Sequence, residues 1–167
     1  MSTQAFEFTP ENLQEFRDIL SRYPERRAAL LPTLHLAQEQ NGHISTEVEA
    51  YVAQIMELPI VDVREVVTFY SLYFRRPMGH HHIRVCMSIA CMLGDCEGIR
   101  NHLRTRLGVA PGGVTADGKF SWEAIPDCLG ACELAPMMQL DGEYYGNLTP
   151  EKVDEILDTA DHADKRG

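Results

Sequence analysis

Cysteines grouped into two close pairs constrain this 167-residue chain more than any other feature. Four residues separate Cys86 from Cys91, and three separate Cys128 from Cys132, while Cys96 lies just after the first pair. Thiolates in groups of four hold iron–sulfur clusters. Two loops that each offer two sulfurs meet that requirement if the fold brings them together. The spacing therefore predicts a metal or cluster site built from these two loops.

Other uses of cysteine compete with this interpretation. Structural zinc also takes four cysteines, but its pairs usually enclose two residues, and the first pair here is wider. A thioredoxin-type dithiol needs Cys-x-x-Cys, which occurs nowhere in the sequence. Inert buried thiols are a further possibility, because free cysteine packs as a small hydrophobe, although close pairing is not expected of them. Spacing alone leaves zinc and iron–sulfur hard to separate.

The composition excludes several functional classes. Hydrophobic residues make up 44% of the chain and charged residues 24%, as in soluble globular proteins. The formal net charge of −10 disfavours binding to nucleic acid or anionic membranes. No apolar run approaches the roughly 20 residues of a membrane span. The N-terminus lacks the features of a secretory signal or a mitochondrial transit peptide. Together with an odd number of cysteines, this predicts a cytoplasmic protein without direct membrane insertion.

Apolar residues at helical spacing predict four helices in the N-terminal half. The first starts at Thr9-Pro10-Glu11, where a capping threonine precedes a first-turn proline and an acid. The third starts near Thr46, which has the spacing of a capping box with Glu49. The fourth is expected from about residue 61 to residue 73. These helices predict a bundle without chemistry of its own.

Strand and helix signals alternate in the C-terminal half. Strands are expected at residues 82–86 and 119–125, with a helix at 96–107 between them. Two short strands joined by Asp141-Gly142 predict a hairpin, and Thr149-Pro150 begins a last helix. Cysteine loops that follow strands, in the order β-α-β and then β-β-α, are typical of a thioredoxin-like sheet.

We therefore predict an α+β protein with two domains. Residues 1–76 form a helical docking domain, and residues 80–160 form a thioredoxin-like α/β domain with a four- to five-stranded mixed sheet. Residues 161–167 are expected to be a polar tail. Gly130 has no Cβ and is expected to let the backbone approach the site closely. The run His80-His81-His82 favours a polar lead-in to a strand, because alternate strand residues point to opposite faces and cannot converge on one ion.

At these residues the sequence resembles a known family, the small thioredoxin-like ferredoxin subunits of NADH:quinone oxidoreductase, which is respiratory complex I. Homologues occur in NAD-dependent formate dehydrogenases and NAD-linked hydrogenases. The likeness covers nearly the whole chain, including the helical half. The residues that carry it are Val67-Thr68-Phe69-Tyr70, Ile83-Arg84-Val85-Cys86 with Cys91, Cys128-Leu129-Gly130-Ala131-Cys132, Ala135-Pro136-Met137 and Tyr144-Tyr145.

The resemblance implies that Cys86, Cys91, Cys128 and Cys132 bind one 2Fe-2S cluster, and that Cys96 is not a ligand. It implies a larger flavoprotein partner that binds FMN and NADH, in a heterodimer within a larger complex. The cluster would lie near the flavin, and the complex would place this chain peripherally on the cytoplasmic side of the inner membrane. No Gly-x-Gly-x-x-Gly fingerprint occurs here, so we expect the NADH site on another chain.

The implied function is that of an electron-transfer subunit of an NADH-oxidising complex. The alternatives are the same module in a formate dehydrogenase or hydrogenase and, from another class, a zinc-stabilised interaction module. Acidic residues flank the cysteines, and negative charge there disfavours adding an electron, so we expect a low reduction potential. These acids are Asp95, Glu97, Asp127 and Glu133.

Overall fold

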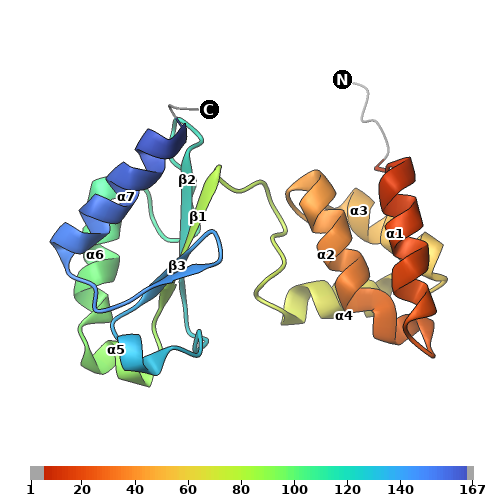
Figure 1. Ribbon diagram of the computed structural model, residues 1–167, viewed down its shortest axis with the longest axis horizontal. Helices are drawn as coiled ribbons and strands as arrows, with labels where there is room; N and C mark the ends of the chain where they lie inside the picture. The colour runs from red at the N-terminus through yellow and green to blue at the C-terminus, as the bar shows by residue number, and fades with distance from the viewer. Residues whose placement is uncertain (1–5, 165–167) are drawn as a thin grey trace. The chain divides into compact units, whose positions relative to one another are not determined.

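The computed structural model describes residues 6–164 and divides into two compact units, Met1–Pro77 and Met78–Gly167. Figure 1 shows the elements of each unit. The regular elements in the described part of the first unit are all helices. They are α1 (Pro10–Ser21), the 3₁₀ helix η1 (Arg26–Ala29), α2 (Leu30–Asn41), α3 (Thr46–Met56) and α4 (Ile60–Phe69).

The helix starts follow from local capping. Thr9 Oγ1 accepts a hydrogen bond from the Asn12 N–H at 3.2 Å, so α1 begins where the sequence predicted. For α3, however, the cap is Ser45 and not Thr46, because the Ser45 hydroxyl accepts from the Val48 N–H at 3.3 Å. The predicted capping box is therefore wrong. Glu49 is instead buried and forms an ion pair with an arginine of α4.

The fourth helix is shorter than the sequence predicted. It ends at Phe69, because Tyr70 adopts an extended backbone conformation with φ −89° and ψ 115°. The turn that follows buries Tyr73, whose hydroxyl donates to the Leu31 carbonyl at 2.9 Å. This hydrogen bond attaches the turn after α4 to α2.

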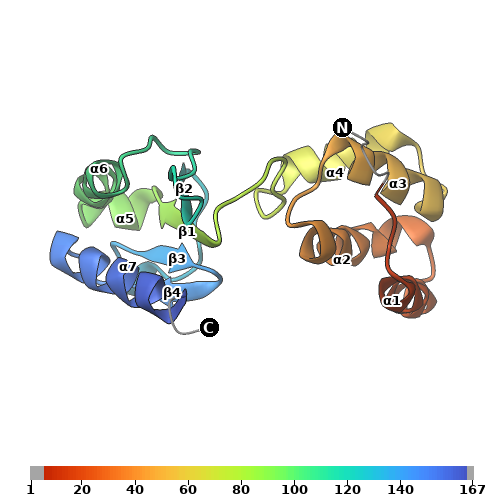
Figure 2. The same ribbon diagram turned by 90° about the horizontal axis from the view of Figure 1, so that it is seen from above.

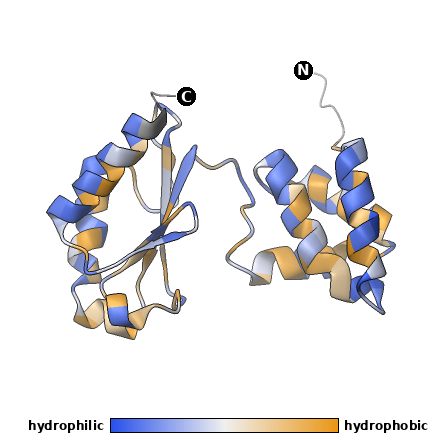
Figure 3. Cartoon of the chain, viewed as in Figure 1, coloured by the Kyte–Doolittle hydropathy of each residue, from blue (hydrophilic) through white to orange (hydrophobic). Residues whose placement is uncertain are grey.

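The first unit has its own hydrophobic core, drawn from every helix. Apolar faces of amphipathic helices bury one another in this way, and Figure 3 shows hydrophobic and hydrophilic segments alternating along the helices. Its most deeply buried members include Leu34, Val48, Val52, Met56 and Val63.

The second unit combines a sheet with helices. The sheet contains β1 (His81–Cys86), β2 (Phe120–Ile125), β3 (Met138–Leu140) and β4 (Glu143–Tyr145), and the helices are α5 (Ile89–Leu93), α6 (Cys96–Leu107), the 3₁₀ helix η2 (Cys132–Leu134) and α7 (Pro150–Asp164). The strand order is β2-β1-β3-β4, with β1 parallel to β2 and both other pairs antiparallel. The predicted mixed sheet is confirmed, with four strands.

Helices cover one face of this sheet. Figure 2 shows α5, α6 and α7 on the same side of it. Ile83 and Val85 of β1, with Trp122 of β2, are fully buried in the core that α6 and α7 complete. Because strand residues alternate between faces, Arg84 and Glu123 lie on the opposite face, where the Arg84 Nε donates to Glu123 Oε1 at 3.0 Å.

Three local predictions for this unit need correction. The helix α7 continues to Asp164, four residues into the segment predicted as a polar tail, while residues 165–167 lie outside the described part, as do residues 1–5. Cys91 was expected in a loop and lies in the short helix α5. The strand β1 starts at His81, one residue earlier than predicted.

Between residues 6 and 164, no helix combines the length and the apolar character that crossing a membrane requires.

Candidate metal centre

Parallel pairing of β1 and β2 brings the two cysteine pairs together. Cys86 is the last residue of β1, and it is in register with Ile125, the last residue of β2. Adjacent parallel strands end at the same edge of a sheet, so the segments that follow them share that edge. One of these segments carries Cys91, and the other carries Cys128 and Cys132. Residues more than 35 positions apart therefore meet.

The sulfur atoms lie close to one another and to backbone polar groups. Cys128 Sγ and Cys132 Sγ are 3.5 Å apart. The Cys86 thiol is 3.7 Å from the Asp127 carbonyl oxygen, on the approach to the second pair. All five cysteines are free thiols.

Burial divides the four predicted ligands into two halves. Cys86 and Cys91 are each 2% exposed and pack with Cys96 and Met137 in a small apolar cluster. Cys128 and Cys132 are exposed. The site therefore has a dry inner half against the sheet and an outer half that another molecule can approach.

The thiols differ in their electrostatic surroundings. The pKa of Cys91 is raised to about 11, mainly by burial and also by the neighbouring thiols of Cys86 and Cys96. In the outer half, the hydrogen bond from the Gly130 N–H lowers the pKa of Cys128, whereas the hydrogen bond with Cys128 raises the pKa of Cys132. Cys86 contributes to the shifts of both outer thiols, so it lies within electrostatic reach of each pair.

Gly130 adopts a backbone conformation that favours glycine. A Cβ at this position would meet no protein atom within 4 Å outside its two chain neighbours, so the protein atoms around it do not by themselves require glycine. The close approach of this backbone to a bound cluster stays a prediction. The φ of Gly130 is +85°, in the left-handed region that residues with a Cβ rarely adopt. This conformation accompanies the 3.4 Å hydrogen bond from the Gly130 N–H to Cys128 Sγ.

The donor set fits a two-iron cluster. A 2Fe-2S cluster spreads four cysteine ligands over two irons. Two thiol pairs at one edge of a sheet meet that requirement.

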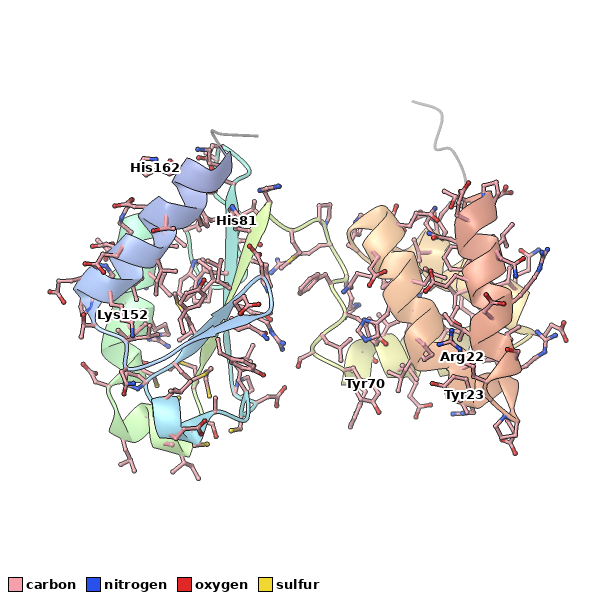
Figure 4. The ribbon with its side chains drawn as sticks, viewed as in Figure 1. Arg22, Tyr23, Tyr70, His81, Lys152 and His162 are labelled. Atoms are coloured by element: carbon pink, nitrogen blue, oxygen red, sulfur yellow. The ribbon has the colours of Figure 1, made fainter. Side chains whose placement is uncertain are left out.

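Cys96 and the histidine run lie outside this arrangement in different ways. Cys96 is fully buried as the first residue of α6, and burial raises the pKa of its thiol. His81 lies at the start of β1, the end remote from α5 (Figure 4), and its Nδ1 is 2.5 Å from Asp141 Oδ2. The histidines therefore belong to the far end of the sheet.

Two features of the site have no clear signal in the sequence. The hydroxyl of Tyr144 donates to the Leu129 carbonyl oxygen at 3.0 Å, across 15 residues of chain. On α5, Ile89, Met92 and Leu93 are 77%, 66% and 87% exposed, although each is apolar. Helical periodicity cannot reveal either feature, because α5 has only five residues and the tyrosine contact depends on the hairpin.

Comparison with known proteins gives a consistent family. The model of the thioredoxin-like 2Fe-2S ferredoxin family matches residues 16–161. The second E subunit of the NADH-quinone oxidoreductase of Rhizobium meliloti is 40% identical over 146 residues, which are 87% of this chain and 86% of that protein. The E subunit of the same enzyme from Rickettsia bellii is 41% identical, covering 92% of this chain and 93% of that protein, and the one from Escherichia coli K12 is 35% identical with 93% of each covered.

Solved structures show the same fold. An NAD⁺-reducing NiFe hydrogenase in the air-oxidised state superposes with a TM-score of 0.65 over 80% of this chain, at 22% identity. The matched region is 23% of the hydrogenase chain, so this chain spans about a quarter of that protein's length.

Proposed function

Because the chain belongs to the thioredoxin-like 2Fe-2S ferredoxin family, we propose that Cys86, Cys91, Cys128 and Cys132 are the four ligands of its 2Fe-2S cluster. The single observation that carries this assignment is the register of β1 with β2, which ends both strands beside the two thiol pairs. Cys96, the first residue of α6, is left out of the ligand set because it belongs to neither pair.

The function is electron transfer, as a subunit of an NADH-oxidising quinone oxidoreductase. This rests on the family and on relatives named as E subunits of NADH-quinone oxidoreductase at 35–41% identity. When bound, a 2Fe-2S cluster supplies one-electron chemistry. The residues of this chain hold and insulate it. Cys86 and Cys91 lie in a dry half, while Cys128 and Cys132 form the exposed edge through which a partner can exchange electrons.

The partner we propose is the larger flavoprotein subunit that carries FMN and NADH. We assign part of its contact surface to α5, where Ile89, Met92 and Leu93 are exposed apolar side chains on either side of Cys91. Adjacent exposed apolar side chains commonly mark interaction sites. A partner seated here would cover the edge of the site and bring its flavin near the sulfurs. A peripheral position on the cytoplasmic side of the inner membrane stays a prediction.

The host enzyme is best assigned to the quinone oxidoreductase. The likeness to an NAD⁺-reducing hydrogenase is a likeness of fold at 22% identity, whereas the curated relatives match over most of their length. Purification of the chain from its native cells, with identification of the co-purifying subunits, tests this choice. A formate dehydrogenase or hydrogenase subunit among them would contradict it.

The ligand assignment is tested by changing each cysteine to serine. Anaerobically purified protein is expected to contain iron and acid-labile sulfide, to absorb visible light that dithionite bleaches, and to give a low-temperature EPR signal when reduced. Serine at position 86, 91, 128 or 132 should remove or alter that signal, because each change replaces a ligand. Cys96→Ser is the matched control and should leave the signal unchanged. Colourless protein with stoichiometric zinc would refute the proposal.

A further inference from the structure

Tyr144 is connected to a cysteine sulfur through a single peptide group. Its hydroxyl donates to the Leu129 carbonyl oxygen at 3.0 Å. That carbonyl belongs to the peptide bond whose nitrogen is Gly130 N, and the Gly130 N–H donates to Cys128 Sγ at 3.4 Å. The three groups form a continuous series from the tyrosine hydroxyl to the sulfur.

The sheet sets the direction of this tyrosine. Tyr144 pairs with Gln139 across the β3–β4 hairpin, and Gln139 pairs with Arg84 of β1, so Tyr144 stands on the face of the sheet that α6 and α7 leave uncovered. Tyr145 points to the other face and packs against the core. From its position Tyr144 reaches the second cysteine segment, while half of its side-chain surface stays exposed.

We propose that Tyr144 is a positioning residue that raises the reduction potential of the site by orienting and polarising the Leu129–Gly130 peptide toward Cys128. The inference rests on the proposed function, in which Cys128 is a cluster ligand. It adds a residue outside the ligand set that tunes the electron-transfer reaction.

The direction of the effect on the potential follows from the negative charge on the ligating sulfur. Reduction adds negative charge to the site, and an N–H donor to a ligating sulfur stabilises that charge, so such bonds raise the potential. A carbonyl that accepts a hydrogen bond polarises its peptide group, which strengthens the N–H on the other side of the same peptide. Gly130, with φ +85°, allows the N–H to face the sulfur, and the tyrosine hydroxyl holds the carbonyl at the opposite end.

The test is Tyr144→Phe in the full-length protein purified with its cluster. This change removes one hydroxyl from a half-exposed side chain, so we expect iron and sulfide contents to match the unchanged protein. The midpoint potential, measured by EPR-monitored redox titration, should shift to more negative values. We expect a shift of up to about 59 mV, which for one electron corresponds to a tenfold change in the equilibrium constant of reduction. Tyr145→Phe is the matched control and should leave the potential unchanged.

The outcomes separate this inference from the proposed function. If the unchanged protein binds no cluster, the proposed function fails. If it binds one, and Tyr144→Phe gives an unchanged or more positive potential, the inference alone fails. Loss of the cluster in Tyr144→Phe would also overturn it, because the hydroxyl would then be a structural anchor and not a tuning group.

Discussion

At the scale of single residues, acidic side chains and amide donors act on the sulfurs in opposite directions. The pKa of Cys132 is raised mainly by its hydrogen bond with Cys128, and the charge of Glu133 makes a smaller contribution in the same direction. This carboxylate therefore disfavours further negative charge on the sulfur. The Gly130 N–H has the reverse effect on the pKa of Cys128. The potential of the site therefore depends on a balance between nearby carboxylates and backbone donors.

Neutralising the acids should shift that balance upward. Asp127→Asn combined with Glu133→Gln removes two negative charges next to the second cysteine pair, so we expect a more positive midpoint potential, with a smaller effect at high salt because the charges are screened. Redox titration at two ionic strengths measures both effects. Asp158→Asn with Glu155→Gln on α7 removes the same charge away from the cysteines and serves as control. No upward shift in the first variant would eliminate a role for these carboxylates.

At the scale of elements, the short helix α5 joins the ligand site to its surroundings. Its buried residue is Cys91, and its other large side chains point outward. Three of its five residues expose apolar side chains to solvent, and these side chains contribute little to the stability of the isolated chain. Such exposure is explained if a partner covers them in the assembled complex.

A charge on α5 should therefore weaken assembly without affecting the cluster. Leu93 is 87% exposed, so Leu93→Lys should fold normally and keep its EPR signal. Burying a leucine contributes about 1.5–3 kcal/mol, and its loss should weaken binding to the flavoprotein subunit roughly tenfold or more. Titration of purified partner chains measures this, with Val114→Lys, at a 37% exposed apolar residue outside α5, as control. Equal affinity for both variants would exclude α5 from the interface.

At the scale of the whole molecule, each unit has its own hydrophobic core. The helical unit buries its own apolar residues, and the small apolar cluster that contains Cys86, Cys91 and Cys96 is drawn from the second unit. The helical unit also exposes large apolar side chains, with Val61 66% and Phe69 78% exposed. Tyr70, at the end of α4 (Figure 4), extends this set. These side chains support docking as the role of the first unit.

Deletion of residues 1–76 tests that role. The remaining chain keeps the sheet, its helices and all five cysteines, so we expect it to retain the cluster and its EPR signal. It should no longer co-purify with the flavoprotein subunit, because the helical surface is lost. The full chain in the same co-purification is the reference. A truncated protein that still assembled would assign docking to the second unit alone.

The sequence by itself determined the features that depend on neighbouring residues. Helix caps, apolar periodicity and the Asp141-Gly142 turn predicted most helices and the hairpin, because each depends on contacts within a few positions. One of its errors occurred where a distant contact decided the conformation. The fourth helix ends early where Tyr73 contacts α2, and the sequence contains no local signal for that end.

Only the tertiary structure decided how the site is built. Spacing indicated which cysteines form pairs, but the pairs meet because β1 and β2 are parallel and in register over the last residues of both strands. The fold leaves one pair buried and the other exposed, and the hairpin brings Tyr144 to the Leu129 carbonyl. These contacts join residues far apart in the chain, and the free energy that selects them comes from packing the whole core.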